Sequence, residues 1–194
     1  MSYPTPKQFH QTELEIKKSR FIAWAQKVQD RSEAMAFLAQ SKIEYPDARH
    51  HCWAYKIGNP KSPSNAGMSD DGEPSGTAGK PILNVLQHKD IGDVMVIVIR
   101  YFGGIKLGAG GLVRAYSGAA EKVISEMPLE QQVVEIEKTI DVDFAKEQHV
   151  RHWLSQNHGR VVAIDYGQCV SMTVAIEQQA FYRLTPFLAE FQNH

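Results

Sequence analysis

An uninterrupted apolar run covers residues 94–99, near the middle of a chain of 194 residues. It belongs to a longer β-like stretch, residues 93–102, in which both faces are apolar from residue 94 as far as Arg100. A strand that is apolar on both faces must be covered on both faces, so this pattern predicts a central strand of a sheet. The run is too short to span a bilayer, and we expect no membrane partner.

Shorter patterns in residues 1–128 predict the elements around that strand. Apolar patterning predicts strands over residues 12–17, 20–28 and 50–57. Helical spacing and capping predict helices over residues 32–41, from Pro81 onward, and over residues 111–127. Residues 58–68 are predicted to form a floppy surface loop. Together these elements predict an α+β layer in which one sheet is backed by helices.

A glycine-rich loop, residues 69–80, directly precedes the helix at Pro81. Its polar side chains are of the types found in functional sites: Asp70, Asp71, Glu73, Ser75, Thr77 and Lys80. The carboxylates could bind magnesium or perform acid–base chemistry. They could also accept backbone N–H groups in a tight turn. Because no nucleophile–base pair is evident, we favour the turn and predict no catalytic residue.

A second glycine-rich segment, residues 100–114, joins the central strand to the helix over residues 111–127. Glycines let a ligand approach the main chain, and a helix N-terminus attracts anions. The predicted phosphate or nucleic-acid site consists of Arg100, Lys106, Gly108, Gly110, Gly111 and Arg114. The rings of Tyr101 and Phe102 could stack on a base. The alternative is a tight turn that needs glycine for packing alone, and neither glycine-rich segment matches a Walker or dinucleotide-binding pattern.

The loops of residues 69–80 and 102–111 leave the same region of the predicted sheet. We therefore expect them to fold against each other and to form one polar cleft. Acidic side chains of the first loop and basic side chains of the second could neutralise each other across it. A small-ligand enzyme that uses the carboxylates of this cleft is one alternative function.

Residues 129–194 predict a separate unit that follows a short bridge, residues 129–132. The pattern predicts a strand over residues 134–144, a helix capped by Asp143, a hairpin of residues 161–166 and 169–176, and a last helix. We expect Pro186 to kink or split this last helix, whose apolar side includes Phe191. The order β-α-β-β-α is that of a split βαβ unit without its final strand. We interpret this unit as a recognition module.

The charge of the chain changes sign at the same place. Residues 1–128 carry 16 basic and 13 acidic side chains, a formal charge of +3, whereas residues 129–194 carry 5 and 9, a formal charge of −4. The two halves therefore favour different partners.

The cysteines and histidines predict neither a disulfide nor a metal centre. Cys52 and Cys169 are far apart in the chain and show no disulfide or zinc spacing. His50 and His51 are neighbours in a predicted strand, so their side chains point to opposite faces. We predict no metal and no cofactor, and the first residues lack the apolar core of a signal peptide, which indicates a cytoplasmic protein.

The two glycine-rich segments carry motifs that resemble the Impact/YigZ family. The motifs are DDGEPSGTAGKP at residues 70–81 and VIVIRYFGGIKLGAGGLVRAY at residues 96–116. Two shorter stretches, ARHHC at residues 48–52 and KSRF at residues 18–21, are also similar to the family. The resemblance covers residue 12 to about residue 127, and the back half is similar to the small second domain of bacterial members.

The resemblance implies a fold of two α+β domains. Residues 1–128 would form the Impact-type domain, with the left-handed βαβ fold of a ribosomal protein domain and of the fourth domain of elongation factor G. Residues 133–194 would form a ferredoxin-like βαββα domain, like the fifth domain of that factor.

The resemblance also implies a role. Eukaryotic Impact proteins act in translational control by binding the activator of a starvation-sensing kinase, and bacterial members are suspected to bind nucleic acids or ribosomes. We therefore expect a non-enzymatic, translation-associated regulator that binds RNA, a ribosome or a translation-regulatory protein. This chain lacks the different extra domain of eukaryotic members. The alternative to RNA binding, besides the enzyme, is a protein adaptor that acts through the acidic back half.

Overall fold

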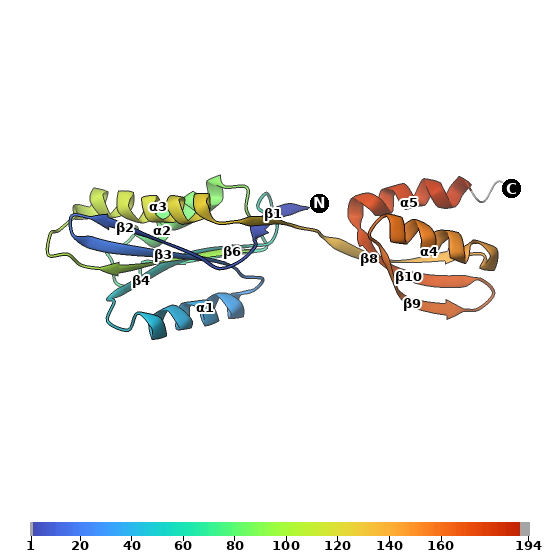
Figure 1. Ribbon diagram of the computed structural model, residues 1–194, viewed down its shortest axis with the longest axis horizontal. Helices are drawn as coiled ribbons and strands as arrows, with labels where there is room; N and C mark the ends of the chain where they lie inside the picture. The colour runs from blue at the N-terminus through green and yellow to red at the C-terminus, as the bar shows by residue number, and fades with distance from the viewer. Residues whose placement is uncertain (1, 191–194) are drawn as a thin grey trace. The chain divides into compact units, whose positions relative to one another are not determined.

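The computed structural model describes residues 2–190, which divide into two compact units (Figure 1). The first unit is Tyr3–Gln132, and the second begins at Val133. Each unit contains both helices and strands, which confirms the predicted two-domain α+β class.

The first unit is built on a five-stranded antiparallel sheet with the strand order β2-β3-β6-β4-β5. The strands are β2 (His10–Ile16), β3 (Ser19–Lys27), β4 (His50–Ile57), β5 (Asn65–Ser69) and β6 (Val94–Tyr101). Strand β6 is the middle strand, and its residues are buried from Val94 to Arg100. The apolar run therefore lies in the centre of the sheet, as its two apolar faces predicted.

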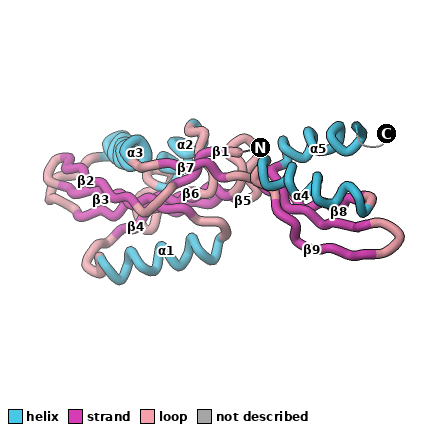
Figure 2. Tube along the Cα trace, turned by 45° about the vertical axis from the view of Figure 1, so that its right-hand side comes forward, coloured by secondary structure: helices cyan, strands magenta, loops and turns pink. Residues whose placement is uncertain are grey.

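Helices cover both faces of this sheet, as Figures 1 and 2 show. Helices α2 (Gly79–His88) and α3 (Gly108–Glu126) lie on one face, and α1 (Arg31–Glu44) lies on the other. Separate clusters of buried apolar side chains fill the α2/α3 side and the α1 side. This cover on both faces is the reason why β6 can be apolar throughout.

The floppy loop predicted for residues 58–68 is partly a strand. Strand β5 pairs antiparallel with β4, which places Gly67 opposite Tyr55. A Cβ atom at Gly67 would lie 2.8 Å from the Tyr55 ring, so the ring packs over a residue without a side chain. A segment of mainly small and polar residues thus forms an edge strand although it shows no apolar alternation.

The bridge predicted for residues 129–132 is also a strand. These residues form β7 (Leu129–Gln132), which pairs antiparallel with β1 (Tyr3–Pro6) in a two-stranded sheet. Lys27 Nζ donates to Glu130 Oε1 and Gln132 Oε1. The first unit therefore extends to Gln132, because the partner of β7 comes from the other end of the unit, where no local pattern can reveal it.

The second unit is a three-stranded antiparallel sheet with the strand order β8-β10-β9. Its elements are β8 (Glu135–Val142), the 3₁₀ turn η1 (Phe144–Lys146), α4 (Glu147–Gln156), β9 (Arg160–Tyr166), β10 (Val170–Glu177) and α5 (Gln178–Glu190). Val150 and Leu154 of α4 pack against Met172 and Val174 of β10 in its core. This order is consistent with the predicted ferredoxin-like βαββα fold.

Some helix boundaries differ from their predictions. Helix α1 is capped by Asp30, whose carboxylate accepts the Glu33 N–H group at 2.8 Å, and not by Ser32. The Asp143 side chain makes no capping bond to the turn that follows it. Pro186 lies inside α5, which continues past it, so the helix is not split. Phe191 lies outside the described residues.

Candidate functional site

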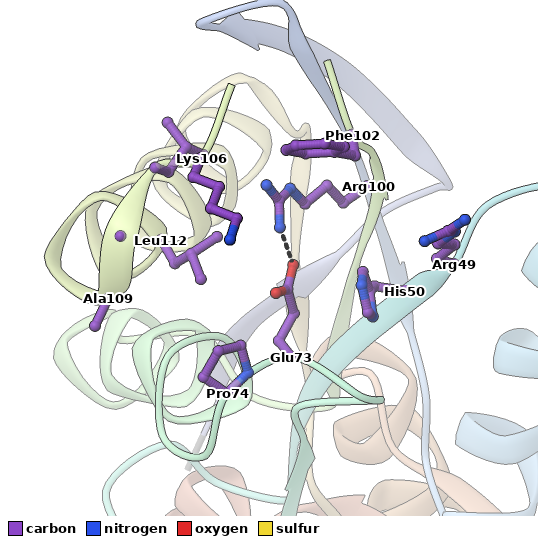
Figure 3. Close-up of a pocket in the computed structure, with 11 residues that line it drawn as sticks. Arg49, His50, Glu73, Pro74, Arg100, Phe102, Lys106, Ala109 and Leu112 are labelled. Carbon is purple, nitrogen blue, oxygen red and sulfur yellow. Dashed lines mark hydrogen bonds and ion pairs between the residues drawn. The ribbon is translucent and has the colours of Figure 1, made fainter. Parts of the chain in front are cut away.

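A pocket of about 330 Å³ lies beside the end of β6 in the first unit. It is formed by the start of β4, the loop of residues 69–80 and the segment that leads from Arg100 into α3 (Figure 3). The lining residues are Arg49, His50, Glu73, Pro74, Arg100, Phe102, Lys106, Leu107, Gly108, Ala109 and Leu112. The two glycine-rich loops thus meet at one cleft, as the sequence predicted, but the lining of this cleft is more apolar than polar.

Arg100 and Glu73 form a buried ion pair in the wall of this pocket. Arg100 Nη1 donates to Glu73 Oε1 at 2.6 Å, and the two side chains are 8% and 4% exposed. The Tyr116 hydroxyl donates to the same carboxylate oxygen at 2.8 Å. Burial raises the pKa of Tyr116, so its hydroxyl keeps the proton that it donates. The charge of Glu73 is therefore held by two donors within the fold.

The guanidinium of Arg100 lies between two aromatic rings. Its Cζ atom is 5.6 Å from the centroid of the Phe21 ring and 5.7 Å from that of Phe102, which are cation–π distances. Arg100 Nε is buried and has no hydrogen-bond partner among the described residues. The guanidinium thus carries a donor that no described part of the protein uses.

Helix α3 begins at this pocket. Gly108, Ala109 and Leu112 line it, and no side chain caps the first turn of the helix. The first N–H groups of a helix lack intrahelical partners and carry partial positive charge. Lys106 and Arg49 add two cations, neither of which forms an ion pair with a described residue. The pocket therefore combines backbone donors with cationic side chains.

The carboxylate of Asp70 organises the neighbouring loop. It accepts the backbone N–H groups of Gly76, Ala78 and Gly79 at 2.8, 3.0 and 2.8 Å. Burial opposes the ionisation of Asp70, but the three N–H groups outweigh burial and lower the pKa of the carboxyl. Since α2 starts at Gly79, Asp70 supports the N-terminus of α2.

Asp71 ties the same loop to the sheet and to α1. Its Oδ2 atom accepts the backbone N–H of His51 at 2.7 Å, and its Oδ1 atom is 3.5 Å from Lys42 Nζ. Its carbonyl oxygen is 2.9 Å from His50 Nδ1. Both aspartates therefore act as acceptors within the fold, which is the interpretation we favoured over a catalytic carboxylate.

The remaining polar residues of the loop of residues 69–80 serve packing or face solvent. The Thr77 hydroxyl donates to the Pro74 carbonyl at 2.6 Å. Ser75 and Lys80 are exposed and do not line the pocket. Of the six polar residues that the sequence placed in the cleft, Glu73 alone is among the residues that line it.

Comparison with known proteins identifies the family. The profile of the Impact N-terminal domain matches residues 17–124, more than half of the chain. This chain belongs to the Impact family. A second profile, that of the domain of unknown function DUF1949, matches residues 140–193.

Relatives of the same family match along nearly the whole length. An IMPACT family member from Haemophilus influenzae is 37% identical over 191 residues, which cover 97% of this chain and 91% of the relative. The IMPACT family member YigZ from Escherichia coli is 37% identical over 179 residues, which cover 92% and 88%. A crystal structure of a hypothetical protein has a TM-score of 0.74 and 36% identity, and the match covers 98% of this chain and 92% of that one. The family predicted from the two glycine-rich motifs is confirmed.

In this Impact family chain, Arg114 lies outside the pocket. It lines a separate hollow of about 290 Å³ together with Lys17 and Gly111. Successive residues of an α-helix are rotated by about 100°, so Arg114 points away from the side on which Leu112 is buried. Gly110 is exposed and does not line the pocket either. Of the six residues that the sequence predicts for an anion site, Arg100, Lys106 and Gly108 line this pocket, whereas Gly110, Gly111 and Arg114 do not.

The two aromatic residues at the end of β6 do not form one stacking surface in this pocket. Tyr101 packs with the cluster on the α1 side, where its ring centroid is 6.5 Å from that of Tyr45 and 5.6 Å from Arg20 Cζ. Phe102 lines the pocket and is 54% exposed. Both residues line a neighbouring hollow of about 250 Å³, so they come together there and not in this pocket.

The sequence does not predict Arg49 and His50 as pocket residues. The only signal is that both belong to the ARHHC motif that resembles the family. A motif does not say which way a side chain points, and the pocket is reached from β4 only because β4 pairs with β6. The resemblance to the family therefore singles out residues 48–52, but it does not show that Arg49 and His50 line the pocket.

A metal centre, a membrane-spanning helix and a nucleophilic Cys52 find no support in the part of the chain that the structure describes. Residues 2–190 contain no group of three or more His, Cys, Asp or Glu side chains that could hold a metal ion. None of the helices in the same range is long and apolar enough to cross a membrane. Cys52 is buried, and burial raises the pKa of its thiol, which makes it a poor nucleophile.

Proposed function

We propose that this Impact family protein is a translation-associated regulator that acts by binding RNA, free or within a ribosome, at the pocket of its first unit. One observation carries the proposal. Three cationic side chains, Arg49, Arg100 and Lys106, line a pocket at the N-terminus of α3, where no side chain caps the helix. Phosphate is the anion best matched to several backbone N–H groups together with a guanidinium.

The position of Phe102 favours single-stranded RNA over a duplex. Its exposed ring lies beside the cations, and stacking of bases on aromatic rings is typical of single-stranded RNA recognition. Arg100 covers one face of this ring, so a base would stack on the other face.

The charge of the chain indicates modest affinity. Residues 1–128 have a formal charge of +3, and dedicated nucleic-acid binders are usually far more basic. We expect binding that is strengthened by the context of a ribosome or a partner protein. Such context-dependent binding suits a regulator.

The link to translation rests on the family, because eukaryotic Impact proteins act in translational control. The non-enzymatic character is supported by the roles of the three carboxylates on which the alternative enzyme hypothesis relies. Asp70, Asp71 and Glu73 each accept hydrogen bonds from other parts of the protein. Glu73 accepts a hydrogen bond from the Tyr116 hydroxyl, but burial raises the pKa of that hydroxyl, which makes it a poor nucleophile.

The test is RNA binding by the wild type and by the double variant Arg49→Ala/Lys106→Ala, measured by fluorescence anisotropy of a labelled single-stranded RNA. Arg114→Ala is the matched control, because it removes a cation from the same unit but outside the pocket. Charge-assisted hydrogen bonds contribute enough for the double variant to bind at least about tenfold more weakly, while the control changes little. Unchanged binding by the double variant would exclude the pocket, and an equal loss in Arg114→Ala would indicate a diffuse basic surface.

A further inference from the structure

The size of the pocket limits how much RNA it can hold. Its volume of about 330 Å³ lies at the lower end of the range of small-molecule sites. An adjoining hollow of about 250 Å³ shares Arg49, Arg100 and Phe102 with it and adds Asp47 and Tyr101. The two together offer space for about one nucleotide, and any further nucleotides of a strand would lie outside them.

Arg100 lines the pocket, but little of its side chain is accessible to a ligand. Its side chain is more than nine-tenths buried, and the rings of Phe21 and Phe102 lie over its guanidinium. One edge nitrogen, Nη1, is bonded to Glu73, while the buried Nε donor has no partner among the described residues. In Figure 3, Arg100 extends toward Lys106 between Phe102 and Glu73. A buried donor without a partner is unfavourable in the free protein, and a ligand that accepts its hydrogen bond would remove that cost.

The local charge matches a phosphomonoester better than a phosphodiester. Three cations (Arg49, Arg100 and Lys106) and one carboxylate (Glu73) give the pocket a formal charge of +2. A phosphomonoester carries about −1.5 to −2 at neutral pH. A phosphodiester inside a strand carries a single negative charge, which would leave part of the positive charge of the pocket uncompensated.

The number of links that each ester makes to the rest of its molecule also favours a phosphomonoester. A phosphomonoester has three free oxygens and one link to the rest of its molecule, so it can enter a narrow site end-on. A phosphodiester has two free oxygens, and its strand must leave the site in two directions. Contact with the mostly buried guanidinium of Arg100 therefore favours a terminal phosphate.

We propose that this pocket binds the phosphomonoester of a nucleotide, either the terminal phosphate of an RNA strand or a free nucleoside monophosphate. The phosphate lies between Arg100, Lys106 and the first N–H groups of α3, and the nucleoside extends along Phe102 into the adjoining hollow. This inference rests on the proposed RNA-binding function and specifies which part of RNA the pocket recognises.

The experiment compares ligands that differ only in their ends. One single-stranded RNA sequence is prepared with a 5′-phosphate, with a 3′-phosphate, or with hydroxyl groups at both ends, and a nucleoside 5′-monophosphate is compared with its nucleoside. Binding to the full chain is measured by calorimetry at constant ionic strength. We expect a terminal phosphate to improve affinity by at least about tenfold, as charge-assisted hydrogen bonds do. Lys106→Ala should abolish this preference, and Arg114→Ala should keep it.

The outcomes separate the inference from the proposed function. If all RNA ends bind equally well and Arg49→Ala/Lys106→Ala still weakens binding, the RNA function stands and the phosphomonoester inference is overturned. If no RNA binds but the nucleoside monophosphate binds in a manner that depends on Lys106, the RNA function is overturned and the ligand is a free nucleotide. If neither class binds, both are overturned.

Discussion

Arg100 and Glu73 come from the two different glycine-rich segments and form a buried ion pair, with 2.6 Å between Nη1 and Oε1. Tyr116 of α3 donates to the same oxygen of Glu73. A strand, a loop and a helix therefore meet at one carboxylate. The shape of the pocket depends on the contacts of Glu73, because Arg100 and Glu73 line the pocket and Tyr116 holds the carboxylate of Glu73 in place.

Glu73→Ala should lower the free energy of unfolding by about 3–5 kcal/mol, since it leaves the buried Arg100 without its partner. Ser75→Ala, at an exposed position of the same loop, should change it by no more than about 0.5 kcal/mol. Denaturant unfolding of both variants measures the difference. A loss in Glu73→Ala no larger than in Ser75→Ala would mean that the ion pair does not hold the two segments together.

Gly103 and Gly110 differ in whether close packing requires a glycine. A Cβ at Gly103 would lie 2.0 Å from the carbonyl carbon of Lys18, whereas at Gly110 the nearest atom, 3.7 Å away, is the flexible end of Arg114. Gly103→Ala should destabilise the fold by more than about 1 kcal/mol through overpacking. Gly110→Ala should be neutral or stabilise by up to about 1 kcal/mol, because alanine suits a helix better. Thermal unfolding checks both, and equal stability of the two variants would contradict this account.

Tyr3 gives the first unit a dependence on alkaline pH. Its hydroxyl donates to Asp93 Oδ2 at 2.7 Å. Burial, together with this bond to a carboxylate, raises the pKa of Tyr3 from 10.0 to about 12. A raised pKa in the folded state adds stability that is fully present below pH 10.0 and is lost as the pH rises toward about 12. Across that window the wild type should lose more stability than Tyr3→Phe in urea unfolding. Parallel losses would show that the pKa of Tyr3 is not raised in the folded state.

The two compact units are proposed to fold independently, with the boundary after Gln132. A chain that ends at Gln132 should unfold cooperatively by itself. A chain that ends at Pro128 should be less stable, because β1 loses its partner strand and Lys27 loses both of its acceptors on β7. Thermal unfolding compares the two. Equal stability would place the boundary at residue 128, where the change of charge predicts it.

Elements that bury a continuous apolar pattern are predictable from the sequence. The apolar run gave β6 its central place, and the helical stripe of Leu112, Ala115 and Tyr116 lies on the buried side of α3. Strands β5 and β7 are not predictable in this way. Each is short and polar or small in composition, and each is stabilised by pairing with a segment whose position only the folded chain determines.

The candidate site is predictable in part. Both glycine-rich motifs mark it, and Arg100, Lys106 and Gly108 lie where the sequence placed them. Arg114 does not, because it lies off the helical stripe that faces the sheet. Arg49 is added by the pairing of β4 with β6, which is a tertiary feature. From the sequence alone, the carboxylates of the loop of residues 69–80 fit both a tight turn and a functional site. Only their hydrogen-bond partners in the structure distinguish these two interpretations.

Whether RNA phosphate occupies the pocket can be determined from the salt dependence of binding. On a single strand, the logarithm of the association constant falls with the logarithm of the salt concentration, with a slope of about −0.7 for each phosphate neutralised. We expect the wild type and Arg114→Ala to share one slope, and Arg49→Ala/Lys106→Ala to give a slope that is shallower by at least about 0.7, with weaker binding. Identical slopes and affinities for all three proteins would contradict the assignment of the pocket as a phosphate site.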